Sequence, residues 1–201
     1  AGLAAAPVSD PVVRQLRGLA GAEARRPPSA AAAEAPAAGG WWTDDAGIVL
    51  LSVYLPRLYE MRALVIEGEF VDQKARARAR ALTRYAIWGE TISNPDSDPA
   101  GRRDCVTAVL CGQEPNHPFE ALVLDEEDRT MVDGLLQAVI GNWTAIGNTS
   151  VSGLREAFLQ RPGVLRREAE NWRLRVEGRA YDMLIDRLPW TYGTIRHRWM
   201  E

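Results

Sequence analysis

Two carboxylates near the carboxyl terminus have a spacing that could support acid–base catalysis. Asp182 and Asp186 would lie one turn apart on the same face of a helix. Two carboxylates in different environments can divide the roles of general acid and general base between them. Arg179 and Arg187 flank the pair, however, and this arrangement is more typical of ion pairs on a protein surface. We therefore interpret both aspartates as ion-paired surface residues.

Serine, cysteine and histidine residues also occur, but without the partners that catalysis or metal binding needs. Ser150 and Ser152 lack the GxSxG turn of a nucleophilic serine, and the histidine that follows them in the chain, His197, lies in the terminal tail. Cys105 and Cys111 would point to different sides of a helix, so we expect neither a disulfide bond nor a zinc site. No phosphate-binding loop is present. The sequence therefore predicts a protein that is not an enzyme and needs no cofactor or metal.

The charge of the chain gives little support for a nucleic-acid or membrane partner. The 201 residues carry a formal net charge of -3, whereas phosphate binding requires a clear basic excess. Arg76, Arg80 and Arg84 follow one another at four-residue steps along a predicted helix and could form a basic stripe. Because no aromatic residue is interleaved with them, a solvated helix face is favoured, and nucleic-acid binding is the alternative. No apolar run reaches the length of a membrane span.

Hydrophobic spacing predicts a mainly helical α+β fold with one small hairpin near the carboxyl terminus. A helix over 1–24, expected to pack on a partner, is followed by an Ala/Pro/Gly linker over 25–40 and a compact domain over 41–201. Within the domain, apolar spacing and end signals predict helices over 44–64, 72–88, 102–111, 126–146, 152–161 and 179–188, and a hairpin over 164–177. Pro56 should kink or break the first of these helices. The last residues, TYGTIRHRWME, are expected to add one more strand.

The stretch NTSVSGLREAFLQRPG is dense in polar side chains and could be taken for an active site. Thr149 and Ser150 can start a short helix by accepting hydrogen bonds from free backbone N–H groups. Pro162 and Gly163 then stop the helix before the predicted hairpin. We therefore interpret these polar residues as helix caps and a stop signal, and not as catalytic groups.

Three long segments of the chain share an ordered set of motifs with one protein family. They read DAGIVLLSVYLPRLYE, AVIGNWTAIGNTSVSGLREAFLQRPG and WRLRVEGRAYDMLIDRLPWTYGTIRHRWM. These segments resemble the carboxy-terminal region of contractile injection system tape measure proteins, which belong to phage-tail-like bacterial particles. The resemblance covers roughly residues 45 to 200, and residues 1–40 lie outside it. Two positions depart from the family pattern: Gly147 replaces a lysine, and HRWM replaces LPWM at the end.

The resemblance implies a structural role in a particle that assembles in the bacterial cytoplasm. A tape measure protein occupies the lumen of the inner tube during assembly, and its length sets the length of the tube. Its carboxy-terminal end is expected near the baseplate, so the implied partners are spike-hub and inner-tube proteins and further copies of the chain. A trimer is favoured, because the spike is threefold. Since the chain begins with Ala1 and not with methionine, we expect an extended measuring region upstream.

The resemblance and the density of aromatic and arginine residues together favour a folded anchor that docks on the hub. Tryptophan and arginine contribute strongly to contact energies between proteins. The hypothesis assigns the docking contacts to five residues: Arg155, Arg161, Trp190, Arg196 and Trp199. Changing Trp190 and Trp199 to alanine is expected to leave the isolated domain folded and to stop particle assembly. The alternative function is a helical adaptor or chaperone that loads cargo into the particle.

Overall fold

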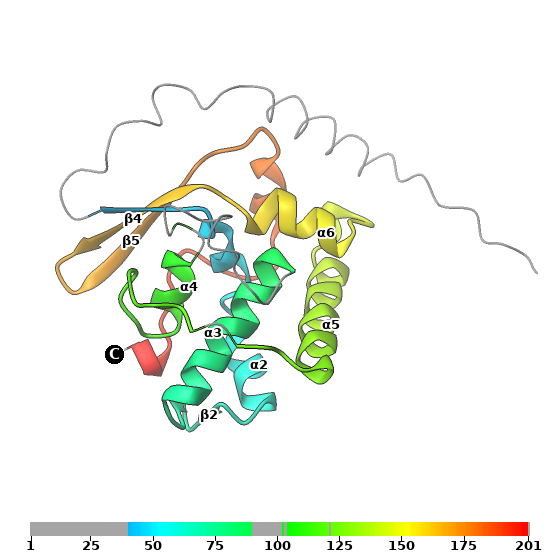
Figure 1. Ribbon diagram of the computed structural model, residues 1–201. Helices are drawn as coiled ribbons and strands as arrows, with labels where there is room; N and C mark the ends of the chain where they lie inside the picture. Colours follow the sequence, from blue (N-terminus) through cyan, green and yellow to red (C-terminus); the bar gives the residue numbers. More distant parts are fainter. Residues whose placement is uncertain (1–39, 90–101, 103, 121, 201) are drawn as a thin grey trace, which may run out of the picture.

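The fold is that of a computed structural model, which describes residues 40–89, 102, 104–120 and 122–200. The predicted helix over 1–24 and all but the last residue of the predicted linker lie outside the described residues. The rest is a helical body with a small antiparallel sheet at one end, so the predicted α+β class is confirmed (Figure 1).

The first predicted helix, over 44–64, is divided into two shorter ones. A 3₁₀-helix, η2, spans Ala46–Leu51, and an α-helix, α2, spans Leu55–Met61. Pro56 lies in the first turn of α2, where its missing N–H group costs nothing because the first amides of a helix have no intrahelical partner. The expected break is present, but it precedes the proline. The predicted interruption of the helix over 44–64 is therefore confirmed, although it lies just before Pro56 and the first part is a 3₁₀-helix.

Two longer helices form the centre of the body. The predicted helix over 72–88 is α3, Gln73–Trp88, which begins at Asp72, whose side chain accepts a 2.7 Å hydrogen bond from the Ala75 amide. The second is α5, Glu126–Asn142, where Asp125 caps the Asp128 amide at 2.8 Å. In Figure 1, α3 runs through the body with α5 on one side and α4, Cys105–Leu110, on the other. The apolar sides of these helices meet in one core, which includes Ile48, Leu51, Leu55, Tyr59, Leu82, Ile87, Leu136, Trp143 and Phe158.

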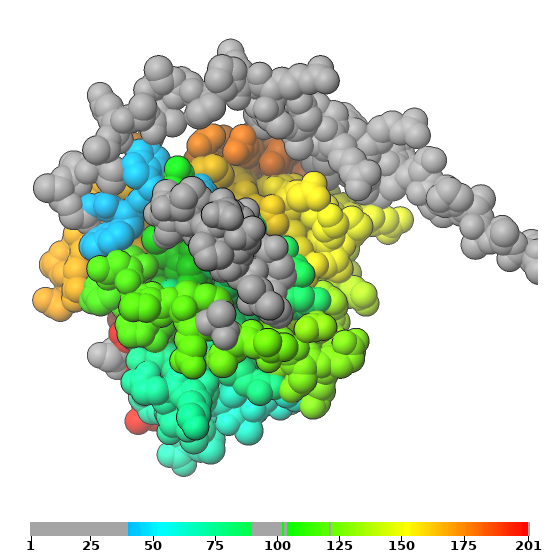
Figure 2. All heavy atoms as spheres, in the orientation of Figure 1, coloured from blue at the N-terminus to red at the C-terminus, as the bar shows by residue number. Residues whose placement is uncertain are grey.

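The main sheet has one strand more than the predicted hairpin. The hairpin consists of β4, Gly163–Glu168, and β5, Asn171–Val176. A third strand, β1, Gly40–Thr43, pairs antiparallel with β4 and gives the strand order β1-β4-β5. Figure 2 shows the residues of β1 beside those of the hairpin at one end of the molecule. A separate pair, β2 at Val65–Ile66 and β3 at Glu69–Phe70, follows α2.

Three of the predicted helices end in, or are replaced by, 3₁₀ or π-helical turns. The helix expected over 152–161 begins as α6, Val151–Leu154, and continues as a wide π-helical turn, η5, Arg155–Leu159. The helix expected over 126–146 ends with α5, and a 3₁₀ turn, η4, follows at Thr144–Ile146. The helix expected over 179–188 is a 3₁₀-helix, η6, Asp182–Arg187.

The predicted strand in the terminal tail is wrong. In place of a strand, residues 191–197 form loops and a short 3₁₀ turn, η7, Arg198–Met200, which brings the buried Trp199 back to the body. In the described part of the chain, none of the helices combines the length and the apolar character that crossing a bilayer demands.

Candidate functional site

The three segments that resemble one family meet at one place, which we call the motif junction: the contacts among η2, residues 148–163 and η6. At its centre, η2 packs directly against the backbone of η5. A Cβ atom on Gly47 would lie 1.8 Å from the carbonyl oxygen of Phe158, so only glycine allows this approach. The amide of Ala46 donates to the carbonyl of Arg161 at 3.0 Å, which fixes the two segments against each other.

The hydroxyl groups at the start of α6 have structural partners. Ser150 accepts a 3.0 Å hydrogen bond from the Gly153 amide and is the N-cap of the helix. Thr149 is buried and donates to the carbonyl of Ile146 at 2.6 Å, so it closes the preceding η4 turn and does not cap α6. The predicted capping role therefore holds for Ser150 and is wrong for Thr149.

Two polar side chains of η5 cap the end of α3. Arg155 donates to the carbonyls of Ala86 at 3.1 Å and Tyr85 at 3.3 Å, and Gln160 donates to the carbonyl of Ile87 at 2.9 Å. The last carbonyls of a helix have few intrahelical donors, so these contacts satisfy the carbonyls of Ala86 and Ile87, whereas the Tyr85 carbonyl also accepts a 2.9 Å hydrogen bond from the Gly89 amide. The π-type turn, closed by the hydrogen bond from the Gln160 amide to the Arg155 carbonyl at 2.8 Å, brings side chains five residues apart to one side.

Arg161 forms a buried ion pair that closes the motif junction on its other side. Its guanidinium donates to both carboxylate oxygens of Asp182, at 2.9 and 3.0 Å, and also to the carbonyl of Glu177. Burial disfavours the charged carboxylate, but the hydrogen bonds from Arg161 and from the Arg179 amide outweigh it and hold the pKa of Asp182 below its ordinary value. The predicted ion pairing of Asp182 is therefore present, but its partner is Arg161, which is 1% exposed, and not a flanking arginine; the Asp182 side chain is 34% exposed.

Three tryptophans bind backbone carbonyls through their indole N–H groups. Trp143 donates to Leu184 at 3.0 Å, Trp190 to Leu50 at 2.8 Å and Trp199 to Leu110 at 2.9 Å. Each acceptor lies in a short helix, α4, η2 or η6, where many carbonyls lack an intrahelical partner. The tryptophans thus contribute both apolar area and polar connections between segments far apart in the sequence.

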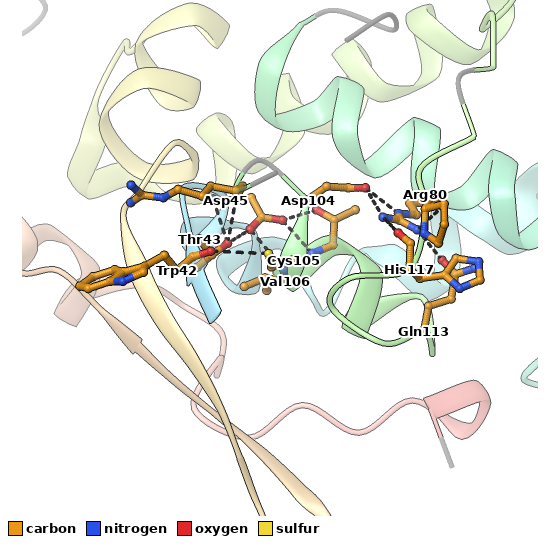
Figure 3. A network of polar contacts seen from close by, with 12 residues as sticks. Trp42, Thr43, Asp45, Arg80, Asp104, Cys105, Val106, Gln113 and His117 are labelled. Atoms are coloured by element: carbon orange, nitrogen blue, oxygen red, sulfur yellow. Dashed lines mark hydrogen bonds and ion pairs between the residues drawn. The ribbon is translucent and has the colours of Figure 1, made fainter. Parts of the chain in front are cut away.

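A second polar centre connects β1, α4 and α3 (Figure 3). Asp45 is buried and accepts hydrogen bonds from the Thr43 hydroxyl, from the Thr107 amide and hydroxyl, both at 2.8 Å, and from the Val106 amide at 3.2 Å. It therefore caps the start of α4 from a distant segment. Burial raises the pKa of Asp45 above its ordinary value, and the hydrogen bonds counter this only in part.

Arg80 occupies the other half of this polar centre. Its guanidinium donates to Asp104 at 2.7 Å, to the carbonyls of His117 and Pro118 at 2.9 and 3.2 Å, and to Gln113 at 3.0 Å. Burial raises the pKa of Asp104 to about 7, although the nearby Arg80 charge acts in the opposite direction. A small cavity of about 200 Å³ lies beside Arg80, and its lining includes Gln73 and Phe119.

The predicted basic stripe on α3 has neither of its expected roles. Arg80 and Arg84 are 3% and 2% exposed, and Arg76 is half-buried with its guanidinium 5.2 Å from the centre of the Phe70 ring. The side chains therefore do not form a solvated face, and buried guanidinium groups cannot reach a phosphate backbone. The physical reason is that the segment after α4 folds over this side of α3, which the spacing of arginines alone does not indicate.

The five residues assigned to docking lie in different environments. Arg196 is exposed, Arg155 and Trp190 are half-buried, and Arg161 and Trp199 are buried inside the domain. The described chain thus does not present Arg161 or Trp199 on its surface, and the docking role of the set stays a prediction. Five residues that connect distant segments were not identified from the sequence: Asp45, Asp104, Gln113, Trp143 and Gln160. They were missed because their hydrogen-bond partners are distant in the chain.

Catalytic chemistry has little support in this arrangement. Both cysteines are buried and free, and burial raises the pKa of Cys111 to about 12, so its thiol is neutral at physiological pH. Within the residues that the structure covers, no group of three or more histidine, cysteine or acidic side chains could hold a metal ion. The polar side chains of both centres are instead bonded to the protein itself.

Comparison with known protein families gives one match, to the contractile injection system tape measure protein, over residues 12–201. The match begins nearer the amino terminus than the resemblance at 45–200, so residues 12–40 are not wholly outside the family pattern. No curated protein and no solved structure matched the chain. The matched range includes the whole motif junction, whose residues carry the resemblance. The chain therefore belongs to the contractile injection system tape measure protein family.

Proposed function

We propose that residues 40–200 form the folded anchor of a tape measure protein and dock on the baseplate and spike hub while the inner tube grows. The motif junction is the observation that supports this most. Its polar side chains, which in sequence could be read as an active site, bind backbone carbonyls and one another inside the domain. Such an arrangement favours a function that depends on the shape of the domain.

A docking element has to keep its shape while other subunits assemble on it. The buried Arg161–Asp182 pair and the capped end of α3 connect segments that are distant in the chain, which favours a single well-defined structure. We propose three copies at the hub, by analogy with a threefold spike.

Within this function, the five residues assigned to docking divide into two groups. Arg196 is exposed and is proposed to contact the hub directly, together with the accessible parts of Arg155 and Trp190. Arg161 and Trp199 are buried and are proposed to act indirectly, by holding the hairpin and the tail in place. Trp199 does so through its hydrogen bond to Leu110 and its stacking on His197 at 4.6 Å.

The proposal is tested by comparing two deletions in cells that produce the complete particle. Removal of residues 41–201 should prevent tube initiation and leave few particles, because the anchor is lost. Deletion or insertion of helical sequence on the amino-terminal side of residue 40 should change the tube length in proportion. Electron microscopy of purified particles measures both number and length. Particles of normal number and length after removal of residues 41–201 would contradict the anchor role.

The same experiment separates the anchor from the adaptor or chaperone alternative. An adaptor predicts that particles without residues 41–201 keep their number and length and lack only their cargo. Mass spectrometry of the particle contents distinguishes this outcome from a loss of assembly.

A further inference from the structure

The three-stranded sheet has one face toward the body and one face toward solvent. On the inner face, Leu165 is buried and Leu174 packs against the core. The register of the strands places the opposite set on the outer face, because directly paired residues point to the same side. We give the name outer sheet face to five residues of this set, Trp42, Val164, Arg166, Arg173 and Arg175. The same register also places Glu168 and Asn171 on this side, next to the turn of the hairpin.

The side chains of the outer sheet face form a compact grid. One row reads Trp42, Val164, Arg175 across the three strands, and the next row places Arg166 directly beside Arg173. Paired residues in neighbouring strands are about 5 Å apart, and rows of one face about 7 Å apart. The three guanidinium groups therefore lie close enough together for the surface of a single partner protein to contact all of them. Trp42 points away from the polar centre (Figure 3), and the Arg102 guanidinium lies 5.6 Å from its ring centre.

The arginines of this grid are poorly compensated within the domain. Arg173 binds Glu168 at 2.7 Å, whereas the side chains of Arg166 and Arg175 have no ion pair or hydrogen bond among the described residues. Like charges placed directly opposite each other in a sheet are destabilising, and Arg166 and Arg173 are such a pair. Neutral residues at these exposed positions would avoid this repulsion, and a partner of opposite charge would remove it.

We propose that the outer sheet face is a docking surface for a carboxylate-rich surface of another protein of the particle. All three cations are arginines, whose planar groups match carboxylates in two-point hydrogen bonds. Trp42 and Val164 supply an apolar centre beside them, and such a combination of aromatic and arginine residues is enriched in protein interfaces.

A protein partner fits this surface better than a nucleic acid. The hairpin itself carries glutamates at 168, 170 and 177 among its arginines, which weakens the field that attracts a polyanion. Discrete pairing with individual carboxylates is not affected in the same way, because it depends on contact geometry. This inference rests on the proposed function, since it takes the partner to be another protein of the particle.

The test reverses the three charges together. The variant Arg166→Glu/Arg173→Glu/Arg175→Glu is compared with the neutral Arg166→Gln/Arg173→Gln/Arg175→Gln in cells that produce the complete particle. A matched control with the same change of net charge is Arg57→Glu/Lys74→Glu/Arg129→Glu, on α2, α3 and α5, outside both the sheet and the motif junction. Thermal unfolding of each purified 201-residue chain checks that it is folded. If the glutamate variant does not fold, the glutamine variant decides the question.

Particle number should fall about ten-fold for the glutamine variant and further for the glutamate variant, while the control assembles normally. Normal assembly by both sheet variants would overturn the inference. If removal of residues 41–201 abolishes particles while the sheet variants assemble, the docking surface is wrong and the anchor role stands. If that removal also has no effect, the proposed function fails as well.

A binding measurement with two polyanions decides between partner classes. The purified chain is titrated into a fluorescently labelled short poly-L-glutamate peptide or a labelled short DNA duplex at one ionic strength. Fluorescence anisotropy of the label measures binding. The proposal expects the peptide to bind, the affinity to fall about ten-fold in the glutamine variant, and the control to bind as well as the unmodified chain. Tighter binding of the DNA duplex, lost in the same variant, would assign the surface to nucleic acid and overturn the proposal.

Discussion

Arg161 and Arg166 are five residues apart in the sequence and lie in opposite environments. Arg161 is 1% exposed and bonded to Asp182 in the motif junction, whereas Arg166 is exposed on the outer sheet face without a partner from the described chain. Arg161 lies just after η5, and Arg166 lies in β4, which begins inside the domain at Gly163. An arginine therefore holds the domain together at position 161, whereas an arginine at position 166 is available to a partner.

The comparison extends to the two regions as a whole. In the motif junction, charged and aromatic side chains satisfy backbone groups that short helices leave open, so removal of any one of them exposes unpaired buried atoms. On the outer sheet face, the side chains have few internal contacts, chiefly Arg173 with Glu168 and Trp42 with Arg102, so their removal leaves few buried atoms unpaired. Stability should therefore depend on the first region and assembly on the second.

The largest difference in stability is expected between Arg161→Ala and Arg166→Ala. Loss of Arg161 leaves the Asp182 carboxylate without its ion pair and should lower the free energy of unfolding by about 3–4 kcal/mol, the lower part of the range for buried pairs, because the Asp182 side chain is 34% exposed. Loss of Arg166 should change it by no more than about 0.5 kcal/mol. Urea unfolding of the two variants at neutral pH measures both values. Equal values would show that the environments differ less than the structure indicates.

The next effect concerns the tryptophans. Trp199 is buried against Tyr59 and Phe70, with ring centres 5.7 and 5.3 Å away, so Trp199→Ala should cost about 3 kcal/mol. The sequence predicts that the isolated domain stays folded when Trp190 and Trp199 are changed to alanine; the burial of Trp199 adds a loss of stability to that expectation. Trp42→Ala, on the outer sheet face, is the matched control and should cost clearly less. Thermal unfolding followed by circular dichroism measures the difference, and an equal loss for Trp42→Ala would remove the distinction.

The third effect is a pH dependence that belongs to the buried polar centre. The pKa of Asp104 is about 7 in the folded protein against an ordinary value of 3.8, so the folded state holds its proton more tightly. Its contribution to stability is fully present below the ordinary pKa and is lost as the pH rises through about 7. The slope should approach about 1.4 kcal/mol per pH unit at most.

Asp104→Asn should flatten this slope, although Asp45, whose pKa is also raised, acts in the same direction and remains. Asp182 has the opposite sign, because its lowered pKa makes stability fall as the pH drops below its ordinary range. Urea unfolding at several pH values between acid and neutral measures the slopes. An unchanged slope in Asp104→Asn would assign the dependence to other groups.

The smallest effect sharpens the comparison because stability and assembly should change in opposite directions. Arg166→Glu places a carboxylate directly opposite Arg173, so a like-charge pair becomes an attractive one. The domain should become more stable by a few tenths of a kcal/mol, in the range of about 0.2–1 kcal/mol for cross-strand pairs. Particle assembly should decrease in the same variant. A loss of stability would show that Arg166 has an internal role.

Some elements of this fold are strongly encoded in local sequence. α3 and α5 have an aspartate cap at the start and regular apolar spacing, so the prediction and the structure nearly agree at Gln73–Trp88 and Glu126–Asn142. The hairpin is also local, because two alternating runs are joined by a short turn at positions 169 and 170. β1 was missed, since a four-residue strand beside an Ala/Pro/Gly segment has no local signal and exists only by pairing with β4.

Burial of polar residues could not be predicted in the same way. The spacing of Arg76, Arg80 and Arg84 indicates that they share a helix face, but it does not indicate what covers that face. The covering segment begins more than twenty residues later in the chain, at Gln113 to Pro118. Arg161 and Asp182 are likewise far apart in the sequence, and they meet because the hairpin between them folds the chain back.

The sequence by itself determined the family, the α+β class and the polar caps of the helices, because motifs, periodicity and capping act over a few residues. Only the tertiary structure decided which arginines and tryptophans lie inside the motif junction and which lie on the outer sheet face. The physical reason is that a charged or aromatic side chain is stable in either place, provided that its hydrogen bonds are satisfied. Its partners are supplied by distant segments, and their positions are fixed only when the whole domain packs.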